Sequence, residues 1–211
     1  MAVMKQGILG GLKGKVANVV GSSWKGIAVL KALPLSVANP RTAGQVAQRS
    51  KLANVVAFAK ILLAATIKPL WDRFASGKSG YNVFVSTNID LFANALPSVF
   101  SSLVISVGKM AATAITAANA NAGTKIADVS WSDDSGEGFK LASDILFLVA
   151  INQTTGEVTN KTVAGTRADT GGDIEFSNNL TAGDVVHIYM SFLRADGTIV
   201  SNNSYISVVA A

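Results

Sequence analysis

Few side chains in this sequence could act on a substrate or hold a metal. Its 211 residues include one histidine and no cysteine. The lack of cysteine excludes thiol nucleophiles, disulfide bonds and zinc or iron–sulfur sites with cysteine ligands. A single histidine, His187, excludes metal sites that need several imidazoles. Because His187 lies in the apolar run VVHIYM, a predicted strand, with no serine–acid partnership visible, we interpret it as a half-buried or surface histidine and not as a catalytic base.

The acidic cluster Asp133, Asp134 and Glu137 is the remaining candidate for chemistry. Carboxylate oxygens are the ligands that Ca²⁺ prefers, and two facing carboxylates are what most glycosidases use. The cluster lacks the ligand spacing of an EF-hand loop, and Ser135 and Gly136 within it are turn-forming residues. We therefore interpret it as a solvent-exposed loop between strands, and we predict no catalytic residue, metal site, cofactor or enzymatic activity. A large apolar cleft holding two facing carboxylates would reopen that question.

Two glycine–lysine pairs look like phosphate-binding loops but do not meet the pattern. Ahead of Gly77-Lys78-Ser79, the position that needs the first glycine holds Asp72. Ahead of Gly14-Lys15 that position holds Leu9, and Val16 replaces the serine or threonine. Neither pair follows a buried parallel strand, so no nucleotide site is predicted.

The longest periodic stretch of the chain runs from Asn39 to Phe74 and predicts a helix. Thr42 and Gln45 form a capping box at its start. Apolar residues then recur every three or four positions, which predicts a broad apolar side that needs a partner surface. This side comprises Val46, Leu52 or Ala53, Val56, Ala59, Leu63, Ile67, Leu70 and Phe74. We expect a helix at least from Thr42 to Ile67. At Tyr81–Phe92 we favour a second helix capped by Ser79, and a strand is the alternative because Val, Tyr and Phe are abundant there.

The first 35 residues are predicted to form an arm that joins subunits. Residues 1–14 are dense in glycine, and the β-prone runs Val16–Val20 and Trp24–Leu33 form a hairpin across the turn Gly21-Ser22-Ser23. A lone hairpin is marginal in water, so it must pack on the following helix or pair with another chain. We hypothesise that Trp24 is the buried anchor of such pairing. The interface candidates are Gly10, Gly11, Trp24, Lys25, Arg41, Arg49 and Trp71.

From about residue 100, short β-rich runs alternate with turn clusters. The runs are Ser101–Val107, Ala114–Ala120, Ile126–Trp131, Ile145–Ile151, Val158–Val163, Asp173–Phe176, Val185–Leu193 and Ile199–Val209. Because the apolar period changes from 3.6 to 2 near Pro97, we predict an α+β chain in two parts. A basic helix-and-hairpin module at residues 1–98 precedes an all-β, immunoglobulin- or fibronectin-like antiparallel sandwich at residues 99–211.

Charge is divided unevenly along the chain. Residues 1–110 hold 13 basic and 2 acidic residues, a net charge of +11, whereas residues 111–211 hold 5 basic and 11 acidic residues, a net charge of −6. The asymmetry indicates an anionic partner for the basic half, either nucleic acid or an acidic protein face, or head-to-tail self-association. The alternative is that these lysines only solvate an alanine-rich helix. Aromatic residues interleaved for stacking on single strands are lacking.

Hydrophobic residues make up 49% of the chain, which is high for a monomer. The longest apolar stretch, Leu52–Ile67, has only 16 residues and contains Lys60, whereas a membrane span needs roughly 20 apolar residues. We therefore predict no membrane span and favour an oligomer that covers the additional apolar surface. The apolar run near the N-terminus is short and interrupted by glycine, so no export signal is expected.

Two sequence motifs resemble those of a known family. GILGGLKGKVANVVGSSWKG at residues 7–26 and NPRTAGQVAQRSK at residues 39–51 are similar to an uncharacterised family of short proteins from Bacteroidota and their phages and prophages. The WSDDSG loop and the final SNNSY strand resemble the same family. The resemblance implies the two-part architecture and a role in a virion or surface assembly. It implies no catalytic residue, because the family has no established activity.

The expected function is that of a non-enzymatic structural subunit. It would self-associate, or join other assembly subunits, through its N-terminal part and display the β-sandwich. A phage capsid, decoration, fibre or tail protein is the leading case, located in the virion or the bacterial cytoplasm. The alternative is a nucleic-acid- or protein-binding module that uses the basic N-terminal half.

Overall fold

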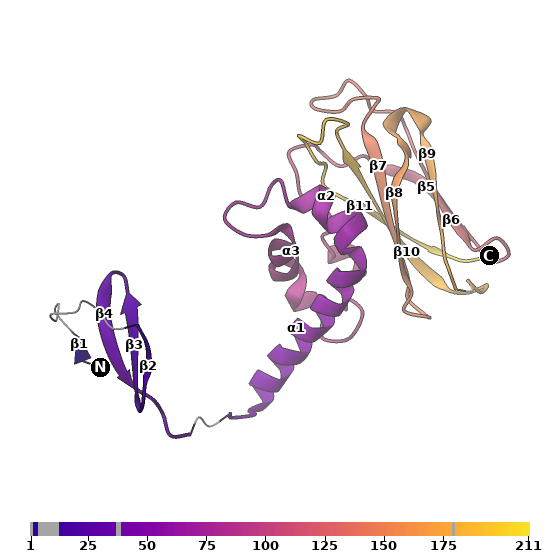
Figure 1. Cartoon of the computed structure of the whole chain (residues 1–211). Helices are drawn as coiled ribbons and strands as arrows, with labels where there is room; N and C mark the ends of the chain where they lie inside the picture. Colours follow the sequence, from indigo (N-terminus) through magenta and orange to yellow (C-terminus); the bar gives the residue numbers. More distant parts are fainter. Residues whose placement is uncertain (1, 4–12, 37–38, 179) are drawn as a thin grey trace. The chain divides into compact units, whose positions relative to one another are not determined.

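The computed structural model describes residues 2–3, 13–36, 39–178 and 180–211, and Figure 1 traces the chain. It has two compact units, Met1–Thr42 (unit 1) and Ala43–Ala211 (unit 2). The boundary lies at the start of the long helix, so the predicted division near residue 98 falls inside unit 2. The physical reason is that this helix packs on the sandwich of its own chain and shares a core with it.

Unit 1 is a small antiparallel sheet with the strand order β1-β4-β3-β2. Its strands are β1 (Ala2–Val3), β2 (Gly14–Val16), β3 (Val19–Trp24) and β4 (Ile27–Ala32). The predicted hairpin is present, but its turn is Lys25-Gly26 and not Gly21-Ser22-Ser23. Both turn residues have positive φ, 48° and 83°, the conformation of a type I′ turn that matches the twist of paired strands. Gly21 and its two neighbours therefore lie inside β3, and Trp24 ends that strand.

Unit 2 begins with a helical layer. The long helix consists of α1 (Ala43–Leu62), a π-helical turn η1 (Leu63–Ile67) and α2 (Lys68–Trp71), which confirms the helix predicted from Thr42 to Ile67. The second predicted helix is α3 (Gly80–Asn88), followed by the 3-10 turn η2 (Ile89–Leu91). The Ser79 hydroxyl accepts a hydrogen bond from the Asn82 backbone N–H at 3.3 Å, as expected of its cap.

Pro69 explains the π-helical turn, and the buried side of the long helix differs from the predicted one. Proline has no N–H to donate to the carbonyl four residues earlier, which is that of Ala65. That carbonyl instead accepts a hydrogen bond from the Thr162 hydroxyl of the sandwich at 3.0 Å. The extra residue in the wider turn rotates the side chains that follow. The buried set is Val55, Phe58, Ala59, Leu62, Thr66, Ile67, Leu70 and Trp71, whereas Val46, Leu52 and Phe74 of the predicted side are exposed.

The rest of unit 2 is a two-sheet antiparallel sandwich, which confirms the predicted immunoglobulin- or fibronectin-like architecture. One sheet has the order β5-β6-β9 and the other β11-β10-β7-β8. The strands are β5 (Ile115–Asn121), β6 (Ile126–Trp131), β7 (Ile145–Asn152), β8 (Val158–Thr166), β9 (Gly171–Glu175), β10 (Val185–Leu193) and β11 (Ser204–Val209), with a 3-10 turn η4 (Arg167–Asp169) after β8.

The predicted strand at Ser101–Val107 is absent, because side-chain amides replace a strand ladder there. A 3-10 turn, η3 (Phe100–Ser102), starts this segment. The Val104 N–H donates to Asn88 Oδ1 at 2.9 Å, and the Ile105 N–H donates to Asn203 Oδ1 at 3.0 Å. The backbone groups are thus satisfied without a neighbouring strand.

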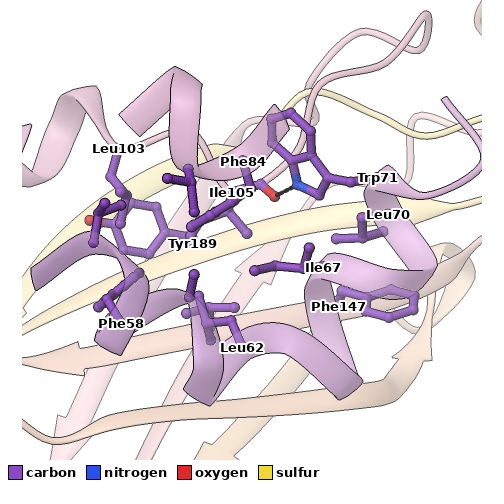
Figure 2. Packing of buried hydrophobic residues seen from close by; sticks show 14 of the residues in the cluster. Phe58, Leu62, Ile67, Leu70, Trp71, Phe84, Leu103, Ile105, Phe147 and Tyr189 are labelled. Atoms are coloured by element: carbon purple, nitrogen blue, oxygen red, sulfur yellow. Dashed lines mark hydrogen bonds between the residues drawn. The ribbon is translucent and has the colours of Figure 1, made fainter. Parts of the chain in front are cut away.

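The four-stranded sheet is covered on both faces, so unit 2 has three layers. Leu146, Leu148 and Ala150 of β7 pack into the sandwich interior. The alternating residues Phe147, Val149 and Ile151 pack against the helices, as Figure 2 shows for Phe147. The surface that the long helix needs is therefore the outer face of its own sheet. Much of the apolar content attributed to an oligomer is hidden within the chain.

Among the described residues, one helix is long and apolar enough to cross a membrane. It is Ala43–Trp71, and 33% of its most apolar stretch is buried in the structure. Because its second half forms the core shared with the sheet, it is better explained as a core helix of unit 2.

The indole of Trp71 generates a first prediction. Its Nε1–H donates to the Ile105 carbonyl at 2.7 Å inside the core (Figure 2). We expect Trp71→Phe to lower the free energy of unfolding by about 1–3 kcal/mol, because it leaves that buried carbonyl without a donor. The matched control is Trp24→Phe, whose side chain is 63% exposed. Guanidinium titration followed by circular dichroism measures both, and equal losses would contradict the role of Trp71.

Candidate functional site

The acidic loop is tied to the sandwich by ion pairs and does not form a metal site. Asp134 Oδ1 lies 2.5 Å from Arg167 Nη1, and Asp134 Oδ2 lies 2.5 Å from Lys140 Nζ. The Asp133 carboxylate accepts the Ser135 backbone N–H at 2.9 Å, which closes the turn. Over the described ranges, no three metal-binding side chains gather in one place. The exposed-loop interpretation is therefore incomplete, because Asp134 anchors a loop whose other acidic residues face solvent.

Arg167, which the sequence reasoning did not single out, is the centre of this arrangement. Its side chain is fully buried, and its guanidinium carbon lies 4.1 Å above the ring of Phe192. Its Nε donates to Asp144 Oδ2 at 3.2 Å, and Asp144 is itself fully buried. Further donations go to the Thr113 hydroxyl and the Met110 sulfur. The only sequence signal was a charged residue four positions after the β-rich run Val158–Val163, which is common in exposed turns as well.

The charges of this cluster stabilise one another. Burial by itself would raise the pKa of Asp134, but hydrogen bonds from Lys140, Thr113 and Arg167 outweigh it and lower the pKa below its ordinary value. The cluster joins β6, the loop after it and η4 at one end of the sandwich. Arg167, Lys140, the Thr113 hydroxyl and the Leu141 backbone N–H hold its two carboxylates, so we interpret the cluster as structural.

His187 lies in the predicted strand but is buried, at 6% exposure, and not half-buried or on the surface as expected. Its Nδ1 lies 2.9 Å from the Tyr205 hydroxyl, its Nε2 lies 3.0 Å from Gln153 Oε1, and its ring stacks on Phe100 at 3.7 Å. An amide oxygen can only accept, so Nε2 carries the proton and Nδ1 accepts from the tyrosine. Burial lowers the pKa of His187 and favours this neutral form. Both ring nitrogens are therefore engaged in holding β10, β11 and the segment around Phe100 together.

An apolar cleft in unit 2 lacks the groups that glycoside chemistry needs. It has a volume of about 530 Å³ and lies in unit 2, lined by Phe74, Val107, Gly108, Lys109, Phe139, Thr198, Ile199 and Val200. None of these side chains is acidic, so the cleft does not hold the two facing carboxylates of a glycosidase. The acidic loop contributes only the apolar ring of Phe139.

The predicted interface residues lie in different settings. Gly10 and Gly11 lie outside the described residues. Trp24 and Lys25 are at the exposed end of the unit 1 hairpin, where the Lys25 ammonium lies 5.2 Å from the indole centre. Arg41 and Arg49 are exposed at the end of unit 1 and on α1.

Trp71 is a correction, because it is 6% exposed and belongs to the helix–sheet core. The π-helical turn ahead of it rotates its side chain inward. It is therefore not available at an interface.

The sheet of unit 1 has two chemically different faces. Side chains at paired positions of neighbouring strands point to the same face. By the pairing of β2, β3 and β4, one face carries Lys15, Val20, Ser22, Trp24, Ile27, Val29 and Lys31, and we name it the lysine face. The other, which we name the uncharged face, carries Gly14, Val16, Val19, Gly21, Ser23, Ala28, Leu30 and Ala32. An open groove of about 160 Å³ on the uncharged face is lined by Gly14, Val16, Val19, Gly21 and Leu30.

Comparison with known proteins gives a family and a remote structural likeness. A family model described as a family of unknown function (DUF6266) matches residues 11–207. A search of curated proteins gave no match. A crystal structure of chicken CNTN1 FN1-FN3 domains is similar at 10% identity with a TM-score of 0.33, over 49% of this chain and 33% of that one. The fold assignment above rests on the strand order and not on this likeness.

The buried guanidinium generates a second prediction. We expect Arg167→Met to lower the free energy of unfolding by about 3–5 kcal/mol, because it leaves the fully buried Asp144 without its cation. The matched control is Lys161→Met, which removes an exposed ion pair with Asp173 at 2.7 Å and should cost at most about 1 kcal/mol. Urea titration of both variants measures the difference. A loss for Arg167→Met no larger than that of the control would show that the cluster is not a stabilising anchor.

The pKa shifts generate a third prediction, on the pH dependence of stability. His187 binds a proton less readily when folded, so stability should be constant above about pH 6.5 and fall as the pH drops below that unfolded value. A second loss should follow as the pH falls from 3.8 to about 2, because the Thr181 backbone N–H and the Asn152 amide lower the pKa of Asp184 to about 2. Denaturant midpoints from pH 8 to pH 2 measure both steps. His187→Gln should remove the first step only, and an unchanged first step in this variant would contradict the assignment.

Proposed function

The chain belongs to the DUF6266 family of unknown function, and we propose that it is a non-enzymatic structural subunit that assembles with its own copies through unit 1. The sequence resemblance described above favours a virion component as the setting of this assembly. Unit 2 then serves as the rigid body that the assembly displays.

The observation that carries the proposal is the poor core of unit 1. Among the hydrophobic residues described in this unit, Val29 alone is buried, at 4% exposure. Val16 and Trp24 are 65% and 63% exposed, and Ile27 is 45% exposed. A sheet of 42 residues without disulfides or metal is at the lower limit of what can fold alone, and it gains stability by covering its apolar side chains with a partner.

Unit 2 supports a structural role in a different way. Its three layers give it a complete core of its own, built from two clusters that share the four-stranded sheet. Its buried charged groups are paired with one another at one end of the sandwich. Both nitrogens of its histidine are engaged by Tyr205 and Gln153 and are not directed at a nucleophile. These features suit a stable displayed domain and not a catalytic one.

A second candidate function follows from the charge of unit 1. Residues 1–42 contain six basic and no acidic residues, and the remaining residues contain 12 basic and 13 acidic ones. Lys15 and Lys31 share the lysine face with Trp24, which is an arrangement that can contact a phosphate backbone and stack on a base. Nucleic-acid binding by this face is therefore the alternative that the test below must separate.

The fourth prediction concerns self-association of the full chain. The monomer has a mass of 21.8 kDa, and light scattering after size exclusion should show the mean mass rising with protein concentration between about 1 and 200 μM. A constant monomer mass over this range would contradict the proposal. The alternative predicts a monomer that binds a labelled oligonucleotide, with an affinity that falls steeply with salt concentration. Oligonucleotide binding by a concentration-independent monomer would favour the alternative.

A further inference from the structure

We infer that unit 1 pairs with unit 1 of a second copy through the uncharged face, in a two-fold symmetric contact. The inference rests on the proposed function and names the partner and the surface that the assembly uses. The lysine face then remains on the outside of the pair.

Charge distribution selects the uncharged face. A two-fold contact places the same patch on both sides, so every charge in it meets a like charge close by. Pairing through the lysine face would bring Lys15 and Lys31 of both copies together, and the six basic residues of unit 1 have no acidic residue within the unit to offset them. The described strand residues of the uncharged face include no ionisable side chain. This face can therefore meet its own copy without like-charge repulsion.

The shape of the uncharged face also suits a copy of itself. Gly14 and Gly21 are paired across β2 and β3, and Gly21 is paired with Leu30 across β3 and β4. A trough without side chains thus lies directly beside a leucine. The position of a Cβ on Gly14 has no atom within 4 Å, so the trough is open at that end, whereas Gly21 is itself buried. A two-fold rotation can place Leu30 of each copy over the trough of the other, as side chains interdigitate between packed sheets.

The size of the face sets the expected strength. Six-residue strands are about 20 Å long and four strands about 19 Å wide, so two copies bury at most about 800 Å² in total. Stable interfaces bury about 1,200 Å² or more. The pair should therefore dissociate at low protein concentration. It should be stable only where an assembly keeps many copies at high local concentration. Such a contact fits a subunit of a repeating assembly.

The fifth prediction tests the face with two matched lysine substitutions in the full chain. Leu30→Lys adds a charge to the uncharged face, whereas Ile27→Lys adds the same charge to the lysine face, at a side chain that is already 45% exposed. We expect Leu30→Lys to weaken self-association at least tenfold and Ile27→Lys to change it less than about twofold. Light scattering over the concentration range used for the parent measures both. Equal effects, or a loss with Ile27→Lys only, would overturn the inference and leave the proposed function standing.

A mixing experiment separates a blocked interface from an unfolded unit 1. Leu30→Glu should self-associate as weakly as Leu30→Lys, because each variant brings like charges together. A mixture of the two should recover association, since the opposite charges then face one another across the contact. No recovery in the mixture would overturn the inference. A parent chain that stays monomeric at every concentration would overturn both the inference and the proposed function.

Discussion

The structure of unit 2 depends on a sheet that must be covered on both faces. β7 and β10 are buried along almost their whole length, with alternate residues directed into the sandwich and towards the helices. An antiparallel sandwich normally leaves one face of each sheet to solvent, so these strands need the helical layer. The long helix, in turn, has no other surface that would bury its apolar side. Helices and sandwich therefore stabilise each other and form one compact unit, although their sequence patterns differ.

Polar side chains define how these layers meet. The Thr162 hydroxyl bonds the helix carbonyl that Pro69 leaves without a donor. The amides of Asn88 and Asn203 satisfy the backbone of the segment that leads from the helices to the sandwich. At the end of the sandwich, Arg167 and its carboxylates fix the acidic loop. Each of these groups makes its hydrogen bonds or ion pairs only when its partners lie in the observed position. Together they favour this arrangement of the layers over others that would bury a similar apolar area.

Unit 1 has the opposite balance of forces. It is strongly basic, its described residues bury little of their apolar surface, and the lysines of its described strands lie on one face. A unit of this kind gains most from a partner that covers the uncharged face and leaves the lysines in solvent. Unit 2, with a full core, gains no comparable stability from assembly. The chain thus combines a unit with a full core and a small basic unit, and this combination is compatible with the function proposed above.

Local patterns in the sequence were sufficient to predict which segments are helices and which are strands for most elements. The periods of 3.6 and 2 residues predicted the long helix and the sandwich, and the lack of cysteine together with a single histidine excluded most catalytic and metal sites. Such patterns depend only on near neighbours in the chain. Three features could not be read from local patterns: the buried side of the helix, the Lys25-Gly26 turn and the unit boundary at Thr42. For each of them, the local sequence is compatible with more than one structure. The contact of Asp134 with Arg167 joins residues 33 positions apart, and Trp71 is a core residue because the Phe84 ring and the Ile105 carbonyl lie against it in the fold. Tertiary packing decided these features, because it determines which distant groups lose their contact with water together.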